Sequence, residues 1–572
     1  MEINVKWILK TRIFFFLFQV MVSIFPDHQH SKNNAFIAPY RLKPHPLIIE
    51  FLFGGFDNWD SEYYLNVANV GGYQIKECHA FFPLYPFLMR FMTLFLYRYT
   101  PIGHFIPFHS LLVISGVTIS NISFIISAIT LYLLTIKIFT IAAVDYNKYT
   151  STNKTSTNET LSSFSSSINE STGSSPSSCV LKRHPVHTSP LTSPLDALPS
   201  VIPPNLSLPM PSLDATSSLT HNVPVSLPSS LNDQVILSPE LIKEIAFLSV
   251  LLYTVNPATI FMCTAYTESL FALFTFSGML AVSHSRLYIS SLLFAGACAT
   301  RSNGIVLIGF ILYHHMVHVL KDFAARGSIL GTGMRILKHG FEMMLQVLIA
   351  LLPFLAFQMY SYHQFCPDPA KTNITLCNAT LPLPYSYVQK EYWELGFLNF
   401  YELKQIPHFI SATPMFILAG IPLWRYFKLA VTNTGHWLFS NKQRYDRHQM
   451  YIDSVLFPYM MQLLFLLIVA AFFMYIQVVT RFVVSSSPVI YWFAGVVFLP
   501  KSTEISSTAS NAVREKNGKG REDSVFTYMK RLVHSSQWSH VEQYDLRQWI
   551  TVYCVIYIII GFVMHCNFLP WV

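Results

Sequence analysis

The stretch FHSLLVISGVTISNISFIISAITLYLLTIKIFTIA at residues 108–142 carries a single charged side chain, Lys137. About 20 mostly apolar residues are enough for a helix to cross a bilayer, where lipid offers the backbone no other hydrogen-bond partner. Similar apolar runs recur along the chain. The sequence therefore predicts an all-α polytopic membrane protein.

The composition agrees with this prediction. Of the residues, 52% are hydrophobic and only 12% are charged, whereas soluble domains carry about 25% charged residues. We predict eleven spans, near residues 7–25, 108–142, 244–262, 266–283, 287–300, 304–320, 341–362, 406–424, 454–478, 484–499 and 548–565.

The basic residues indicate how these spans are oriented. Lys6, Lys10 and Arg12 accompany the first apolar run, and no small-residue cleavage site follows it, which predicts a retained signal anchor with a cytosolic N-terminus. Counting from there, the short basic turns at 321–338 and 425–450 fall on the cytosolic side, as the positive-inside rule requires. The net charge of +8 therefore reflects topology, and we expect no nucleic-acid partner.

We predict five parts along the chain. Residues 1–144 hold the signal anchor, a long first lumenal loop and the second span. Residues 145–240 are dominated by Ser, Thr, Pro and Asn, and such a segment buries too little apolar surface to offset the entropy of ordering. We therefore predict a disordered cytosolic insertion there. The other parts are the membrane core 241–500 with a lumenal loop at 363–405, a basic cytosolic loop at 501–547, and the last span with a lumenal C-terminus at 548–572.

The same topology divides the sites of covalent modification. Asn373 and Asn378 lie in sequons of a lumenal loop and can be glycosylated. Four other sequons fall in the cytosolic insertion, at Asn153, Asn158, Asn169 and Asn205. Cys366 and Cys377 share the lumenal loop, whose compartment permits a disulfide. The sequence leaves open whether they are bonded or free.

The first lumenal loop, residues 26–106, is rich in aromatic residues and proline. Its end, FFPLYPFLMRFMTLFLYRYT at 81–100, surrounds Arg90 and Arg98 with apolar side chains. This pattern favours a helix lying in the membrane interface, with its arginines in the phosphate layer. The alternative is a span interrupted by prolines.

The segment GGFDNWDSEYYLNVANVGGY at 54–73 holds the densest cluster of acids and aromatics. Asp57, Asp60 and Glu62 lie within six residues, beside Trp59 and Tyr63. Aromatic faces stack on sugars, and a carboxylate can act as the base that removes a proton from an attacking hydroxyl. Alternatively, Asp60 and Glu62 only stabilise the start of a short helix.

Several ordered stretches resemble one known family. They are the Trp-Asp motif followed by AFFPLYP at 80–86, NPATIFMCTAYTESLFALFTFSGM at 256–279, RSNG at 301–304, YWELGFLNFYELKQIPHF at 392–409, TRFVVSSSPVIYWF at 480–493 and HCNFLPW at 565–571. Together they are similar to the GPI mannosyltransferase 2 family of the GT-C class of multi-spanning glycosyltransferases. The insertion at 145–240 departs from the family's pattern.

The resemblance implies an activity and a place in the cell. The family adds the second mannose, in α-1,6 linkage, from dolichol-phosphate mannose to the GPI-anchor precursor, at a lumenal site of the endoplasmic reticulum membrane. The transfer inverts the anomeric centre. Asp60 is then the expected catalytic base, Glu62 is expected to orient it or to bind the acceptor, and Trp59 and Tyr63 are expected to contact substrate.

The phosphate that leaves in such a reaction is stabilised by nearby cations. Arg301 and Arg481 lie at span ends, at the depth of a lipid phosphate, although an arginine there can also simply reach toward the interface. His79 and Lys404 are lower-ranked candidates for the same role. Glu268 is a candidate for binding a sugar hydroxyl, or an acid favoured by the helix dipole.

We expect no cofactor and no essential metal, because the sequence has no Asp-x-Asp motif. The adjacent His314 and His315 point to different sides of a helix and are weak ligand candidates. The expected partners are the two lipid substrates and the membrane, and a small membrane subunit is left open. Two alternative functions also stay open: another dolichol-phosphate-mannose GT-C enzyme, acting on N-glycans or protein, and a polytopic lipid transporter.

Overall fold

A computed structural model describes residues 5–28, 45–169, 239–324, 329–367, 374–434, 455–499 and 540–569. Most of the predicted basic loop 501–547 and most of the predicted insertion lie outside these ranges. Asn205 and Asn373 lie outside them too. The described residues form helices and turns and contribute no strand. The chain divides into two compact units, one of residues 1–148 and 235–572, the other of residues 149–234.

The larger unit begins with α1 and the short helices of the first loop. These elements are α1 (Val5–Val22), α3 (Leu47–Phe53), α4 (Asp60–Val70), the 3-10 helix η2 (Lys76–Ala80), α5 (Leu84–Tyr99) and α6 (Ile102–Phe105). The helices that follow are α7 (Phe108–Asn169), α8 (Pro239–Thr254), α9 (Thr259–Cys263), α10 (Glu268–Ser283), α11 (Leu287–Thr300), η3 (Ser302–Leu307), α12 (Ile308–Ala324), α13 (Ile329–Phe365), α14 (Pro384–Trp393), η4 (Leu403–Gln405), α15 (Ile406–Thr434), α17 (Phe457–Phe473), η5 (Ile476–Val478), α18 (Val479–Val484), α19 (Val489–Val497) and α22 (His540–Cys566).

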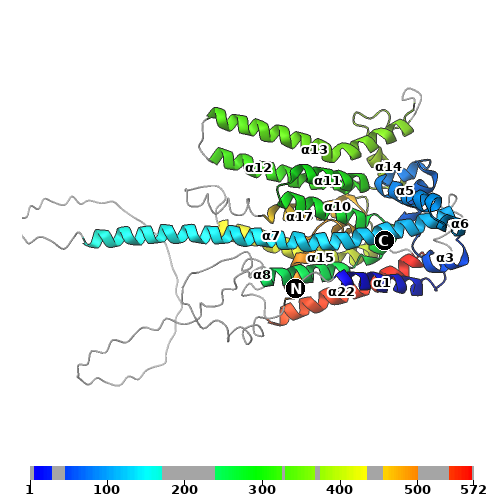
Figure 1. The fold of residues 1–572 in the computed structure, drawn as a ribbon, viewed down its shortest axis with the longest axis horizontal. Coiled ribbons are helices and arrows are strands. Elements are labelled where there is room, and N and C mark those ends of the chain that lie inside the picture. The colour runs from blue at the N-terminus through cyan, green and yellow to red at the C-terminus, as the bar shows by residue number, and fades with distance from the viewer. Residues whose placement is uncertain are drawn as a thin grey trace, which may run out of the picture. The chain divides into compact units, whose positions relative to one another are not determined.

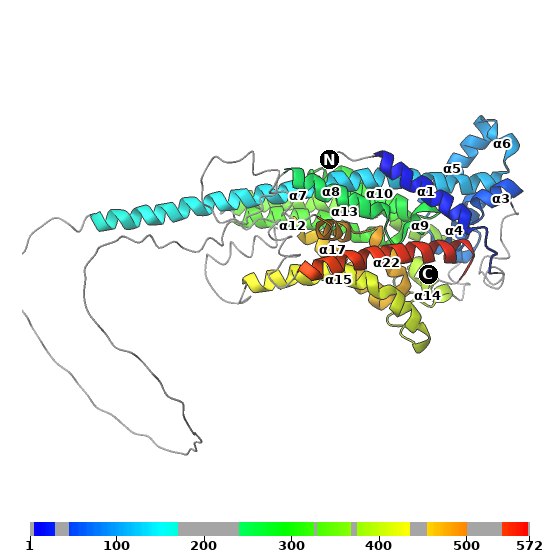
Figure 2. The same ribbon diagram turned by 90° about the horizontal axis from the view of Figure 1, so that it is seen from below.

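Five of the described helical segments are long and apolar enough to cross a membrane. They are Phe108–Ala142, Ser302–Phe323, Leu330–Phe365, Leu403–Lys428 and Asp545–Cys566. Three shorter apolar helices, α10, α11 and α17, accompany them. Helix α11 packs against α10 and α13, and α13 also packs against α12. Helix α1 contacts α22 (Figures 1 and 2). The prediction of an all-α multi-pass membrane protein is confirmed, while the number eleven stays a prediction.

A proline that follows a polar residue breaks one predicted span and delays the start of the helix in another. Span 244–262 divides at Asn256 and Pro257, between α8 and α9. Proline lacks an N–H and restricts the residue before it, and the Asn256 side chain instead accepts the Ala258 N–H at 2.9 Å. Helices α18 and α19 separate in the same way just before Pro488. Both breaks lie in buried protein, where irregular backbone is tolerated at membrane depth.

Helix α7 extends further than the sequence suggested. It continues to Asn169, through the first part of the segment predicted to be disordered. Residues 145–169 contain neither Gly nor Pro, and adding a residue to an existing helix is far easier than nucleating one. Poor core-forming composition therefore did not by itself mean the absence of helix.

The end of the first loop forms helix α5, which is not among the segments long and apolar enough to span. Large apolar side chains such as Phe91 and Phe95 are exposed along it. Arg90, however, does not reach outward: its guanidinium donates to the carbonyl oxygens of Ala68 and Asn69 at 2.8 and 2.7 Å. Arg90 thus satisfies the last carbonyls of α4, which need a donor. That α5 lies in the membrane interface stays a prediction.

Cys366 and Cys377 are joined by a disulfide, with their Cα atoms 5.8 Å apart. The bond ties the end of α13 to the loop that leads to α14 and lies among the buried side chains of Phe365, Leu376 and Val388. Of the two alternatives that the sequence left open, the structure forms the bonded one. A persistent disulfide suits an oxidising compartment such as the lumen.

Candidate functional site

Helix α4 begins at Asp60, directly after a residue with an unusual backbone conformation. Trp59 has φ 61°, a region that a bulky residue adopts only when its surroundings enforce it. Its ring stacks on Phe568, with centroids 4.9 Å apart. The Asn58 amide donates to the carbonyl oxygens of His565 and Cys566 at 3.1 and 3.0 Å. Contacts with the end of α22 thus hold the Trp-Asp motif in place.

The Asp60 side chain does not cap its own helix. Its Oδ2 accepts a hydrogen bond from Arg481 Nη1 at 2.6 Å, and the Asp60 N–H donates to the Tyr266 hydroxyl at 3.0 Å. No side-chain cap forms at the start of α4. The carboxylate is 33% exposed, so one side of it is open to a ligand. The capping alternative therefore accounts for its place in the helix, but not for its contacts.

Two further charged residues continue from this pair into the protein. Glu268 is fully buried at the start of α10, and its Oε1 lies 2.5 Å from Arg301 Nη1 and 3.8 Å from Arg481 Nη1. Arg301 also donates to Thr267 Oγ1 at 3.0 Å. Two carboxylates and two guanidinium groups thus alternate in the order Asp60, Arg481, Glu268 and Arg301. We call this arrangement the charge chain. Its formal charge is balanced, which makes burial of the four groups tolerable.

The charge chain is assembled from helix ends. Glu268 is the first residue of α10, Arg301 follows the last residue of α11 in extended conformation, and Arg481 belongs to the short α18. Arg301 therefore leaves the backbone where a helix stops, and Arg481 leaves it from a helix of only six residues. Four segments that are distant in sequence bring their charges to one point in this way.

Arg481 remains a cation in this environment. Burial disfavours its charged form, but the neighbouring Asp60 and Glu268 outweigh that effect and raise the pKa of Arg481 above its ordinary value. Its guanidinium lies 5.0 Å from the centroid of the Phe261 ring. Its Nε has no hydrogen-bond partner, and neither has Glu268 Oε2. Both ends of the Arg481–Glu268 contact thus keep unused hydrogen-bonding capacity.

A small hollow adjoins Arg481. It is lined by Pro257, Ala258, Phe261, Ser411, Gln477, Thr480, Arg481 and Tyr557. The polar groups of this lining include the buried Gln477 Oε1, which has no hydrogen-bond partner. The break between α8 and α9 contributes the apolar side of the hollow. The guanidinium of Arg481 therefore binds the Asp60 carboxylate and also lines this hollow.

The other predicted site residues lie outside the charge chain. Tyr63 stacks on Phe81, with ring centroids 4.5 Å apart. Glu62 is in the first turn of α4 and partly buried. Lys404 is largely exposed and pairs with Glu402 at 2.5 Å.

His79 is buried and bonded to Ser361 Oγ at 2.8 Å. Burial lowers the pKa of His79 to about 4, so the imidazole is neutral near pH 7 and carries no charge to offer a phosphate. Of the four cations considered for this role, Arg481 therefore contacts Asp60 and Arg301 contacts Glu268, while His79 and Lys404 lie outside the charge chain.

Residues beside the predicted ones also belong to the site. The Tyr266 hydroxyl accepts a hydrogen bond from the Asp60 N–H. The Thr267 hydroxyl lies 3.2 Å from the Tyr64 hydroxyl and accepts a hydrogen bond from Arg301. Tyr266 and Thr267 immediately precede Glu268, so the polar segment AYTES was a usable signal. His565 packs against the Tyr266 ring, with centroids 5.4 Å apart; nothing local in the sequence connects it to Asp60.

Comparisons with known proteins identify the family of the chain. The chain matches the family described as Mannosyltransferase (PIG-V) over residues 2–165 and 225–572. It is 32% identical over 359 residues to the GPI alpha-1,6-mannosyltransferase 2 of Mus musculus and to that of Homo sapiens, covering 57% of this chain and 70% of each relative. The GPI mannosyltransferase 2 of Schizosaccharomyces pombe is 31% identical over 251 residues, covering 43% of this chain and 47% of that protein. No solved structure matches. The chain belongs to the PIG-V family of mannosyltransferases and is a glycosyltransferase.

Proposed function

We propose that this mannosyltransferase adds the second mannose, in α-1,6 linkage, to the GPI-anchor precursor, with dolichol-phosphate mannose as donor. The names of its relatives support the acceptor and the linkage. The observation that carries the proposal for the site is the 2.6 Å pairing of Arg481 with the partly exposed Asp60 carboxylate. It supports a catalytic base beside a cation that can bind the leaving phosphate.

The proposed transfer is a single displacement. The 6-hydroxyl oxygen of the acceptor attacks the anomeric carbon of the donor, and Asp60 takes the hydroxyl proton. The new carbon–oxygen bond forms as the bond to the phosphate oxygen breaks, and the electron pair leaves with dolichol phosphate. A β-linked donor then gives an α-linked product, and the phosphate needs no proton to leave.

Arg481 is proposed to bind the leaving phosphate. In the free enzyme its guanidinium holds the Asp60 carboxylate in place through the 2.6 Å contact. The donor phosphate, arriving on the side of the hollow, would use the unpaired Nε and draw the guanidinium toward itself. The loss of that contact would free the Asp60 carboxylate to act as base. Arg301 is held by the buried Glu268, and its role is to fix the second acid against Arg481.

The proposal extends to the substrate contacts and the topology. Glu62 would orient Asp60 or bind the acceptor, and Trp59 would form an apolar surface for a sugar. Eleven spans with the charge chain on the lumenal face of the endoplasmic reticulum membrane would place the site beside both lipid substrates. The transfer would use no metal, because the guanidinium of Arg481 would supply the positive charge that a metal would give a phosphate.

Complementation of cells that lack the second mannosyltransferase tests this proposal. Asp60→Asn should insert normally but fail to restore surface display of GPI-anchored proteins. Asp57→Asn is the matched control, because Asp57 lies in the same motif but pairs with His45 at 3.3 Å. Rescue by Asp60→Asn at the wild-type level would contradict the catalytic assignment.

Lipid analysis of the same cells separates the rival functions. Cells carrying the inactive variant should accumulate precursors with one mannose. Accumulation at a different mannose step would indicate another dolichol-phosphate-mannose enzyme. An unchanged precursor pattern with altered lipid distribution would indicate a transporter.

A further inference from the structure

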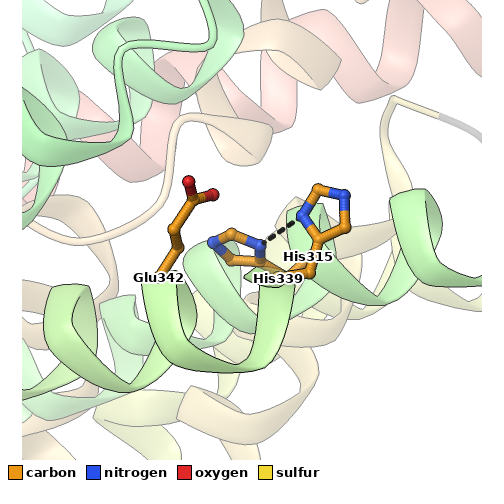
Figure 3. Close-up of side chains that lie close together, drawn as sticks. All are labelled: His315, His339 and Glu342. Carbon is orange, nitrogen blue, oxygen red and sulfur yellow. Dashed lines mark hydrogen bonds between the residues drawn. The ribbon is translucent and has the colours of Figure 1, made fainter. Parts of the chain in front are cut away.

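A group of metal-ligating side chains lies between α12 and α13, outside the charge chain. It consists of His315 on α12 and of His339 and Glu342 on α13, and we call it the His–His–Glu cluster. One ligand atom from each residue lies within 4.8 Å of the other two. Figure 3 shows the two imidazole rings facing each other, with the Glu342 carboxylate beside His339. The sequence suggested only a weak role for His315, because its partners come from another helix.

Neighbouring groups orient the ring of His315. Its Nε2 lies 2.9 Å from Gln346 Oε1, which can only accept a hydrogen bond, so Nε2 carries the proton. The lone pair of His315 is then on Nδ1, which faces His339. Histidines that bind metals are usually held in this way, with the second ring nitrogen donating to an oxygen.

The ring of His339 has a looser contact on its other side, where its Nε2 lies 3.8 Å from Asp322 Oδ2. Its Nδ1 lies 3.4 Å from Nδ1 of His315, within hydrogen-bond distance (Figure 3). Without a metal ion, a neutral His339 ring with its proton on Nδ1 can donate to the lone pair of His315. A metal ion bound between the two nitrogens would take the place of that proton.

The separation of the two nitrogens fits a bound metal ion. Zinc binds imidazole nitrogen at about 2.0–2.1 Å in tetrahedral geometry, which places two such nitrogens about 3.3–3.4 Å apart. The observed distance is 3.4 Å. Glu342 follows His339 by three residues and therefore lies on the same face of α13. Two imidazoles and one carboxylate are a ligand set suited to zinc, with a fourth position left for water.

We propose that the His–His–Glu cluster binds one divalent transition-metal ion of the zinc class, which links α12 to α13. Lys338 lies 3.9 Å from Glu342, but its side chain is 73% exposed and can turn outward when a metal binds. His315, by contrast, is buried and fixed. The ion would therefore replace a weak surface contact with coordination bonds between two membrane helices.

This site is separate from the proposed transfer chemistry. His315 follows Arg301 by fourteen positions along η3 and α12, and a helical rise of 1.5–2.0 Å per residue makes that more than about 20 Å. An ion there cannot touch a phosphate held by Arg301 or Arg481. Its role is to fix the packing of α12 on α13, and the transfer itself stays independent of metal.

Metal binding by the purified full-length chain in detergent tests the proposal. After treatment with a chelator and its removal, the protein is titrated with Co²⁺ and, separately, with Zn²⁺. We expect one ion per chain, a visible Co²⁺ absorption band of tetrahedral type, and displacement of Co²⁺ by Zn²⁺. His339→Asn should weaken binding at least about 100-fold. His284→Asn is the matched control, because His284 is an exposed histidine at the end of α10.

The proposal is overturned if the wild-type chain takes up no stoichiometric Co²⁺, or if His339→Asn binds as tightly as wild type. The same conclusion follows if His284→Asn removes the absorption band. Because His339→Asn can also disturb folding, Glu342→Gln provides a second variant with almost the same shape. It should elute as wild type in size-exclusion chromatography while it loses the Co²⁺ band.

Discussion

Removing Arg481 should lower mainly the activity of the enzyme, and removing Arg301 should lower mainly its stability. Both arginines contact the buried Glu268, but Arg301 lies at 2.5 Å from it and Arg481 at 3.8 Å. The closer partner of Arg481 is Asp60, whose carboxylate is 33% exposed and can be hydrated when the arginine is lost. We therefore expect Arg481→Met to disturb mainly the reaction and Arg301→Met mainly the fold.

The magnitudes follow from burial. Arg481→Met leaves Glu268 paired with Arg301. The free energy of unfolding should therefore fall by only about 1 kcal/mol, the scale of a partly solvated ion pair. If Arg481 stabilises the leaving phosphate, activity should fall about 100- to 1,000-fold, as when one donor is removed from a charged transition state. Arg301→Met leaves a fully buried carboxylate without its close partner, which typically costs about 3–5 kcal/mol.

Two measurements on each variant separate these effects. Mannosyl transfer in microsomes gives the activity, and size-exclusion chromatography after heating in detergent gives the stability. The double variant Glu268→Met with Arg301→Met should recover most of the stability, because replacing a buried ion pair by apolar groups is often neutral. The reasoning is refuted if Arg481→Met unfolds at a lower temperature than Arg301→Met, or if it keeps wild-type activity.

Three further predictions concern the lumenal side. Cys366→Ser should lower the free energy of unfolding by about 2–3 kcal/mol, since the disulfide closes a short loop, and a reductant should lower the melting temperature of wild type but not of the variant. Asn378 is exposed, so Asn378→Gln should remove a shift in gel mobility caused by glycosidase, whereas modification at Asn153 would contradict the topology. Because burial lowers the pKa of His79 from 6.5 to about 4, the neutral ring stabilises the fold above pH 6.5, and this contribution is lost as the pH falls from 6.5 to 4. His79→Asn should flatten the dependence of melting temperature on pH in that window, and an unchanged curve would contradict this origin.

The all-α membrane fold was predictable because apolar runs report directly on burial in lipid. The breaks at Pro257 and Pro488 were less predictable, since a proline in a membrane helix can produce either a kink or a stop. The extension of α7 to Asn169 was not predicted, because composition indicates poor core formation and says little about continuation of an existing helix.

The charge chain was predictable in its members and not in its connections. Glu268, Arg301 and Arg481 stood out because charged residues are rare near the ends of apolar runs, where each needs a partner. Their order of pairing depends on which helix ends meet, and no local pattern contains that information. His79 shows the opposite case: the sequence made it a lower-ranked candidate cation, but its surroundings make it a neutral, buried ring.

The bonds from Asn58 to the carbonyl oxygens of His565 and Cys566 connect an early segment of the chain to a late one. During translation the loop with Asp60 emerges long before α22 is made. Until the ribosome has delivered α22 into the bilayer, the Trp-Asp motif lacks its contacts with Phe568, His565 and Cys566, and the base is not yet fully held in position. The enzyme is therefore expected to stay inactive throughout its own synthesis, and a premature stop codon that removes only α22 should yield an inserted but catalytically silent chain.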